Sequence, residues 1–195
     1  MKLLSNRHIL NRAAMPLAVL SAAILSACAS APMVTAMMPA PFSQAALPAA
    51  VQVPAGHSVF LESPHKGEIN YQCRIKAGTD NQAAWFFVGP DARMLTRQGK
   101  DIGRYFGPPA TWDGADGSTV VGAQVAVSPN GAANIPLQML KTSSTRGAGM
   151  LKATTYIQRV NTMGGVAPNL PCTVASLGNS KFVPYTADYI FWKAN

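Results

Sequence analysis

The sequence is poor in charged residues. Asp, Glu, Lys and Arg make up 12% of its 195 residues, and only 8 of them are acidic, whereas about 25% of an average soluble domain is charged. This scarcity excludes a charge-rich disordered chain and a coiled coil. Beyond the amino-terminal region the sequence also lacks any apolar run near the roughly 20 residues that a membrane-spanning helix needs. A protein with several transmembrane helices is therefore excluded, and the length allows one ordinary domain.

Clusters of basic residues are also lacking, although the formal net charge is +8. The first 54 residues contain three basic residues, Lys2, Arg7 and Arg12, and no acidic residue. The remainder has 13 basic and 8 acidic residues, a mild net charge of +5. Nucleic-acid-binding proteins usually gather Lys and Arg on one face. We therefore predict no nucleic-acid partner.

Glycine is absent before Gly56, and the amino-terminal part of that stretch is typical of an export signal. A basic segment, residues 1–12, precedes a thirteen-residue apolar segment, residues 13–25, which is short for a membrane span and typical of a secretory signal peptide. The following Leu25-Ser26-Ala27-Cys28 resembles the lipobox of bacterial lipoproteins, which implies cleavage before Cys28 and lipidation of its thiol and new amine. We predict a lipoprotein-type signal peptide over 1–27, with ordinary secretory cleavage after Ala29 as the alternative.

Residues 28–54 are rich in Ala and Pro and carry no charge. Because prolines recur throughout, a long helix is excluded, and we predict a semi-extended tether between the membrane and a domain over 55–195. No Asp follows Cys28, which resembles lipoproteins sent to the outer membrane. The expected location is the bacterial cell envelope, as an outer-membrane lipoprotein facing the periplasm and bound to the membrane through Cys28; secretion is the alternative.

Two cysteines, Cys73 and Cys172, remain if Cys28 carries lipid. An exported chain enters an oxidising compartment, where a leftover pair usually forms a disulfide. The alternative, a redox or metal-binding thiol, lacks a C-x-x-C arrangement and a nearby histidine. We predict a structural Cys73–Cys172 disulfide.

Short apolar segments punctuated by Gly and Pro follow Gly56, and none sustains the 3.6-residue period of a helix. Ile69 to Lys76 and Tyr185 to Trp192 alternate apolar and polar side chains, which is typical of half-buried antiparallel strands. In Thr119 to Val127, the alternation puts Val121 and Val125 on one apolar face. We predict an all-β domain, an antiparallel sandwich or barrel of about eight to ten short strands. The other expected strands lie in 85–88, 135–140 and 151–160.

Several strings in this domain carry a family resemblance. They are Tyr71-x-Cys73, Trp85-x-Phe87-x-Gly89-Pro90-Asp91-Ala92, Thr111-Trp112-Asp113-x-x-Asp116-Gly117-Ser118, Thr155-Tyr156-Ile157-Gln158-Arg159-Val160, Gly164-Gly165-x-Ala167-Pro168 and Tyr185-x-Ala187-Asp188-Tyr189-x-Phe191. In order and spacing, over residues 55–195, they resemble the family catalogued as domain of unknown function 3455, found in exported bacterial and fungal proteins. The resemblance implies a fold and export, and no established activity. This chain has Tyr105 where many members carry a histidine, so any chemistry of that histidine is lacking here.

The segment from Trp112 to Ser118 is the first candidate site. Its two carboxylates, Asp113 and Asp116, together with an indole and flexible glycines, could bind a sugar, an amine or Ca²⁺, or act as an acid–base pair. The alternative is a plain turn, in which Asp side chains cap the bend through local hydrogen bonds.

Arg159 is the second candidate. Either it lies at a solvated strand end, or it is buried and paired with Asp188 or Asp116, or it binds an anion. A structural ion pair is the interpretation that we favour over an anion site.

Histidines are too few and too isolated to predict catalysis. The domain has only His57 and His65, which we interpret as exposed loop residues, and neither H-E-x-x-H nor G-x-S-x-G occurs. We therefore predict no metal and no cofactor. The sequence favours a non-enzymatic binding or envelope-associated module for a small molecule, glycan or protein, with Trp112, Asp113, Asp116 and Arg159 as its binding residues. The alternative is a secreted hydrolase or other enzyme that uses Asp113 and Asp116.

Overall fold

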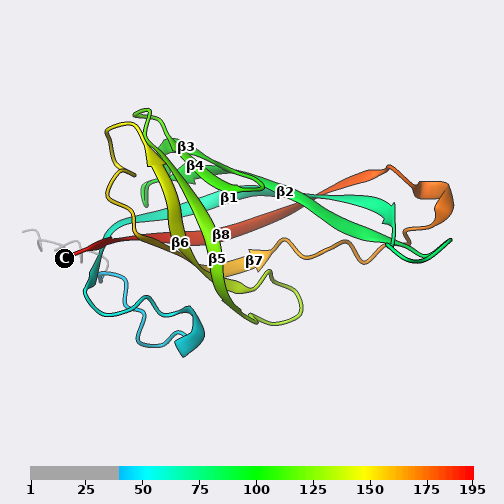
Figure 1. The fold of residues 1–195 in the computed structure, drawn as a ribbon, viewed down its shortest axis with the longest axis horizontal. Helices are drawn as coiled ribbons and strands as arrows, with labels where there is room; N and C mark the ends of the chain where they lie inside the picture. Colours follow the sequence, from blue (N-terminus) through cyan, green and yellow to red (C-terminus); the bar gives the residue numbers. More distant parts are fainter. Residues whose placement is uncertain (1–39) are drawn as a thin grey trace, which may run out of the picture. The chain divides into compact units, whose positions relative to one another are not determined.

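A computed structural model describes residues 40–195 (Figure 1), and these form an all-β domain. The expected signal peptide, the lipidation site Cys28 and residues 28–39 of the expected tether lie outside the described residues. The strands are β1 (His57–Ile75), β2 (Ala83–Leu95), β3 (Asp101–Phe106), β4 (Ala110–Gly114), β5 (Thr119–Ser128), β6 (Leu137–Arg146), β7 (Tyr156–Gly164) and β8 (Ser180–Ala194). Two single-turn 3-10 helices, η1 (Ala49–Val51) and η2 (Val174–Ser176), complete the described elements.

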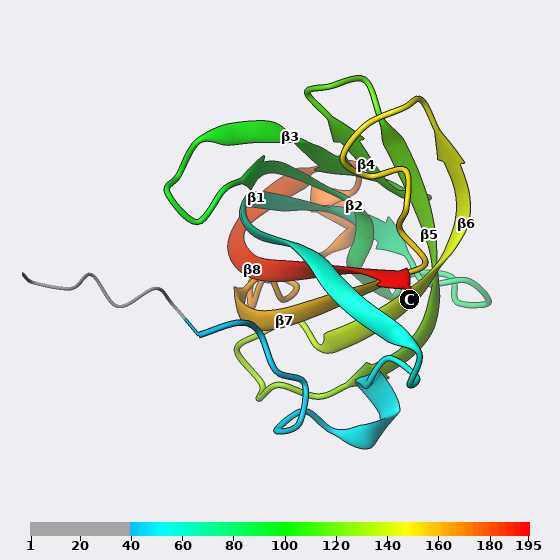
Figure 2. The same cartoon turned by 90° about the vertical axis from the view of Figure 1, so that its left-hand side faces the viewer.

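The eight strands form one closed antiparallel barrel, which Figure 2 shows as a ring. Each strand pairs with its neighbour in the sequence, and β1 pairs with β8 to close the sheet. The prediction of an all-β sandwich or barrel is confirmed, and of the two architectures the structure has the barrel. Within residues 40–195 no helix is both long and apolar enough to cross a membrane.

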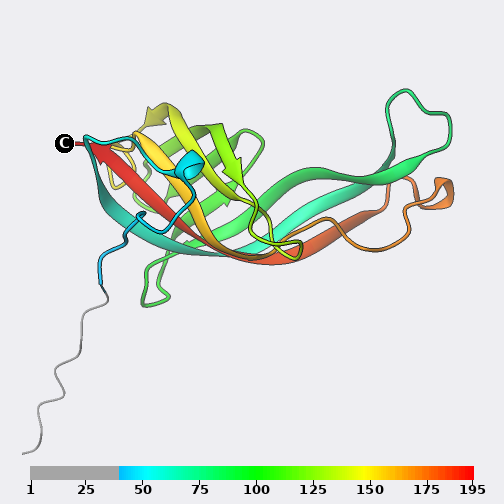
Figure 3. The same cartoon turned by 90° about the horizontal axis from the view of Figure 1, so that it is seen from below.

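Two strands are much longer than the short strands that the sequence predicts. β1 has 19 residues and β8 has 15. The end of β1, the start of β2 and the start of β8 continue beyond the barrel as a three-stranded arm (Figures 1 and 3). The arm is not part of the ring because β3 pairs only with residues 91–95 of β2. The arm carries the predicted disulfide, which is confirmed: Cys73 of β1 is bonded to Cys172 in the connection between β7 and β8.

Aromatic rings fill the barrel interior. Trp112 of β4 and Tyr189 and Phe191 of β8 are fully buried there, and Tyr105 of β3 stacks on Trp112 with ring centroids 4.6 Å apart. Alternation along each strand places every second side chain inside, which is why Tyr189 and Phe191 share this core while Ile190 and Trp192 face outward. The interior is therefore a packed aromatic core.

Residues 40–54, which composition places in the tether, pack instead on the outside of the barrel (Figure 3). Val51 and Val53 are buried against Met139 of β6 and Ile190 of β8. The side chain of Gln158 in β7 donates to the carbonyl oxygen of Val51 at 2.6 Å. This bond attaches residues 40–54, which we call the strap, to β7. Residues 137–140 of β6 and 189–192 of β8 are consequently buried on both faces, and the compact unit spans Ala40–Asn195.

Candidate ligand-binding site

Trp112 does not lie on a surface loop. It belongs to β4 and points into the barrel, where its exposed fraction is 0%. Its ring stacks on Tyr105 and meets Tyr189 edge-on. Trp112, which the sequence offers as a binding residue, is thus a core residue of β4, because alternation along the strand turns its indole inward.

Asp113 and Asp116 are near the same turn, on the outside of the barrel. Asp113 accepts a hydrogen bond from the hydroxyl of Thr119 at 2.7 Å. Asp116 accepts three, from the hydroxyl and the amide of Ser118 and from the amide of Met150. These bonds, first of all that from the Ser118 hydroxyl, hold the pKa of Asp116 below its usual range. A general acid needs a carboxyl pKa raised toward neutrality, so this geometry gives Asp116 the properties of a turn-stabilising residue.

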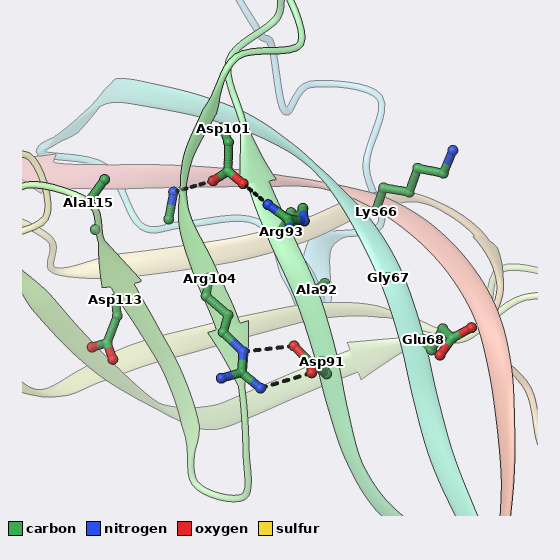
Figure 4. Close-up of a pocket in the computed structure, with 12 residues that line it drawn as sticks. Lys66, Gly67, Glu68, Asp91, Ala92, Arg93, Asp101, Arg104, Asp113 and Ala115 are labelled. Atoms are coloured by element: carbon green, nitrogen blue, oxygen red, sulfur yellow. Dashed lines mark hydrogen bonds and ion pairs between the residues drawn. The ribbon is translucent and has the colours of Figure 1, made fainter.

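An open groove lies beside Asp113 on the outer face of β1 to β4 (Figure 4). It has a volume of about 610 Å³, and charged side chains of both signs line it. Arg104 makes two 2.8 Å hydrogen bonds to Asp91, and Arg93 pairs with Asp101. The side-chain hydrogen bonds from Arg104 lower the pKa of Asp91. The two arginines are therefore already paired, while Lys66 and Glu68 line the groove outside any salt bridge among residues 40–195.

Arg159 of β7 lies elsewhere, at an opening of the barrel. Its Nε and Nη2 atoms donate to the carbonyl oxygen of Pro136 at 3.1 and 2.9 Å. The expected ion pair with Asp188 or Asp116 is absent: Asp188 accepts from Asn161 and lies 3.7 Å from Arg97. Among residues 40–195 no carboxylate forms a salt bridge with Arg159, so the structure does not support the ion-pair interpretation.

A pocket of about 340 Å³ surrounds this guanidinium. Its wall is formed by β1 to β7 and the turns between them. Arg159 is the only charged residue among those that line it. Such a volume is at the lower end of the range for small-molecule sites. The wall consists of Ile69, Tyr71, Phe87, Pro90, Tyr105, Gly107, Pro108, Ala110, Gln124, Ile135, Pro136, Gln138 and Arg159.

Polar groups without protein partners lie in and beneath this pocket. Gln138, opposite Arg159 in the β6–β7 ladder, donates to Gln124 at 2.6 Å, while its Oε1 atom is buried with no partner among the described residues. The hydroxyls of Tyr185 and Tyr189 are likewise buried without a partner. Burial raises the pKa of both tyrosines, and the positive charge of Arg159 opposes the rise. Both hydroxyls therefore remain protonated donors.

His65 joins this interior cluster, contrary to its interpretation as an exposed loop residue. It lies within β1, its exposed fraction is 1%, and its ring centroid is 4.3 Å from that of Tyr189. Its Nδ1 atom is 2.9 Å from the carbonyl oxygen of Ser63, while its Nε2 atom has no partner. Burial lowers the pKa of His65 to about 3. Residues 40–195 contain no group of three or more His, Cys, Asp or Glu side chains that could hold a metal ion, at His65 or elsewhere.

The pKa of His65 predicts a loss of stability in mild acid. Its unfolded pKa is near 6.5, so between pH 6.5 and 3 the unfolded chain binds a proton that the folded chain refuses, and stability falls as pH falls. We expect the free energy of unfolding to drop by about 2 to 3 kcal/mol between pH 6.5 and 4.5, at about 1.4 kcal/mol per pH unit. Carboxylates contribute mainly below this window, since their unfolded pKa values are near 4.

Urea unfolding of the parent and of His65→Phe over this pH range measures the effect. The variant is expected to show a much smaller slope, whatever its stability at pH 7, and His57→Phe, at a half-buried position at the start of β1, serves as the control. An equal slope in parent and His65→Phe contradicts the assignment.

The sequence identified Arg159 as a candidate binding residue but did not identify the other residues of its pocket. Tyr105, Gln124 and Gln138 come from β3, β5 and β6, and only closure of the barrel brings them to Arg159. One pattern in the sequence pointed there: Tyr185, Ala187 and Tyr189 alternate on the inward face of β8.

No curated protein and no solved structure matches the chain. A family model described as Protein of unknown function (DUF3455) matches residues 54–193, which spans the barrel from the residues before β1 almost to the end of β8. Because the match covers about seven-tenths of the sequence, the chain belongs to the DUF3455 family.

Proposed function

We propose that this protein is an exported binding protein of the bacterial cell envelope that holds a small molecule in the barrel opening around Arg159. One observation carries the proposal: a partly buried guanidinium lines a pocket of about 340 Å³ that contains no carboxylate to pair with it. Removing a charge from water without a counterion is costly. A charge retained in this way is typical of a site that receives its partner from a ligand.

Export and anchoring are supported by the sequence. The apolar segment of residues 13–25 and the lipobox-like string ending at Cys28 favour a lipid anchor that faces the periplasm from the outer membrane, with a secreted form as the alternative. The disulfide between Cys73 and Cys172 is in keeping with an oxidising compartment. A Cys28→Ser variant is expected to leave the detergent phase in a partitioning experiment; a variant that partitions as the parent does contradicts the anchor.

Blocking the pocket tests the binding function. We expect a thermal-shift screen of neutral, cationic and anionic small molecules to find compounds that raise the melting temperature of the parent by about 5 to 10 °C at a hundredfold excess over Kd. Gln124 is exposed at the pocket edge, so Gln124→Trp is expected to fill the opening and abolish the shift.

Ala123→Trp is the matched control, because Ala123 is exposed, lies on the same strand and does not line the pocket. Its shift is expected to equal that of the parent. Compounds that stabilise Gln124→Trp as strongly as the parent, or a screen in which no compound stabilises the parent, contradict the proposed function.

A further inference from the structure

The unused side of the Arg159 guanidinium defines what the pocket can bind. Its Nε and Nη2 atoms share the carbonyl oxygen of Pro136, and no described residue accepts a hydrogen bond from Nη1. One hydrogen on Nη2 and both hydrogens on Nη1 therefore form a planar edge with no acceptor within hydrogen-bond distance among residues 40–195, and the buried Tyr189 hydroxyl is a polar neighbour of this guanidinium. Such an edge matches the two oxygens of a carboxylate, which it binds through two parallel hydrogen bonds.

The rest of the wall limits the ligand to one negative charge and an apolar body. Arg159 is the only cation that lines the pocket, whereas a phosphate monoester carries about −1.5 to −2 charges at neutral pH and would keep part of its charge uncompensated. Most of the other lining residues are apolar, among them Ile69, Phe87 and Ile135. A carboxylate attached to a hydrocarbon or aromatic body satisfies both features.

The other polar side chains that line the pocket are uncharged. Gln124 and Gln138 add amides to the wall, so they can accept or donate hydrogen bonds without bringing a second charge to the ligand.

We propose that the pocket binds an amphiphilic monocarboxylate, with its carboxylate on the free edge of Arg159 and its apolar body against Ile135 and Phe87. This inference rests on the proposed function and specifies the ligand class for the same site. The outer groove is a poorer anion site because its arginines already pair with Asp91 and Asp101 and its lining carboxylates outnumber its cations.

Calorimetric titration of the full chain with matched pairs of compounds tests the ligand class. The probes are 4-phenylbutyrate, decanoate and indole-3-acetate, each beside its primary amide, which keeps the body and removes the charge. We expect at least one carboxylate to bind ten- to a hundredfold more tightly than its amide, the range for a hydrogen bond to a charged group.

Arg159→Gln is expected to remove this difference by weakening the carboxylate ten- to a hundredfold while changing the affinity of the amide less than about twofold. Arg159→Lys, which keeps the charge and loses the planar edge, is expected to fall between the two. Arg93→Gln, on the outer groove, is the control and leaves both affinities unchanged. The melting temperature of each variant reports that it is folded.

Equal binding of acid and amide, or equal loss of both in Arg159→Gln, overturns the carboxylate assignment. If none of the six compounds binds but other compounds bind the parent and fail to bind Gln124→Trp, the ligand class is wrong and the binding pocket stands. If no compound of either set binds, the proposed function fails together with the inference.

Discussion

Replacing Cys73 and Cys172 together by alanine is expected to lower the free energy of unfolding by about 4 to 5 kcal/mol. The two residues are 99 positions apart, so the bond closes a loop that spans most of the barrel sequence. Cross-linking a loop of about 100 residues removes about 4.7 kcal/mol of conformational freedom from the unfolded chain in the chain-entropy account. Cys73 is also fully buried, so the loss of its sulfur adds to the effect.

Urea unfolding followed by far-UV circular dichroism measures this change. Reduction of the parent isolates the loss of the cross-link, because both sulfur atoms remain, and it is expected to account for most of the difference. The slope of the unfolding free energy against urea is expected to rise, since the unfolded chain expands when it is no longer cross-linked. A loss of less than 1 kcal/mol on reduction contradicts a structural role for this bond.

Trp112→Ala is expected to cost about 3 to 5 kcal/mol, the range for removing a large aromatic side chain from a core. Trp112 is fully buried and contacts Tyr105, Tyr189 and Phe191. Its removal leaves a cavity that the surrounding strands cannot close, because each is fixed by its ladder on both sides. If Trp112 were a surface residue that binds a ligand, the same substitution would change stability by less than about 0.5 kcal/mol.

Chemical denaturation of parent, Trp112→Ala and Trp112→Phe distinguishes the two roles. Trp112→Phe keeps one aromatic ring against Tyr105 and is expected to recover more than half of the loss. A Trp112→Ala variant with parental stability contradicts the placement of this residue in the barrel core.

The alternation of apolar and polar residues predicted much of the sheet, because it marks strands that are buried on one face and exposed on the other. Ile69, Tyr71 and Cys73 are buried as that pattern indicates. In β5 the same reasoning selected the wrong face. Val120 is buried, whereas Val125 is 54% exposed, and irregularities in the ladder between Val121 and Gly122 and between Gln124 and Ala126 shift the pairing. A bulge moves side chains to the other face without leaving a mark in the hydrophobic pattern.

The strap and the pocket could not be predicted for a related reason. The Ala- and Pro-rich composition of residues 40–54 excludes a long helix, but it does not exclude packing, and Val51 and Val53 find their partners on β6 and β8. Arg159 stood out as a charge within an apolar strand. Gln124 and Gln138 did not, because an amide on a strand becomes a pocket residue only when the barrel closes.

A crystal structure of the protein with saturating 4-phenylbutyrate tests the binding site around Arg159 most directly. We expect the carboxylate within hydrogen-bond distance of Arg159 Nη1, with the phenyl ring between Ile135 and Phe87. A compound bound instead to the outer groove beside Arg93 and Arg104, or an empty pocket at a concentration that saturates the protein in solution, would contradict it.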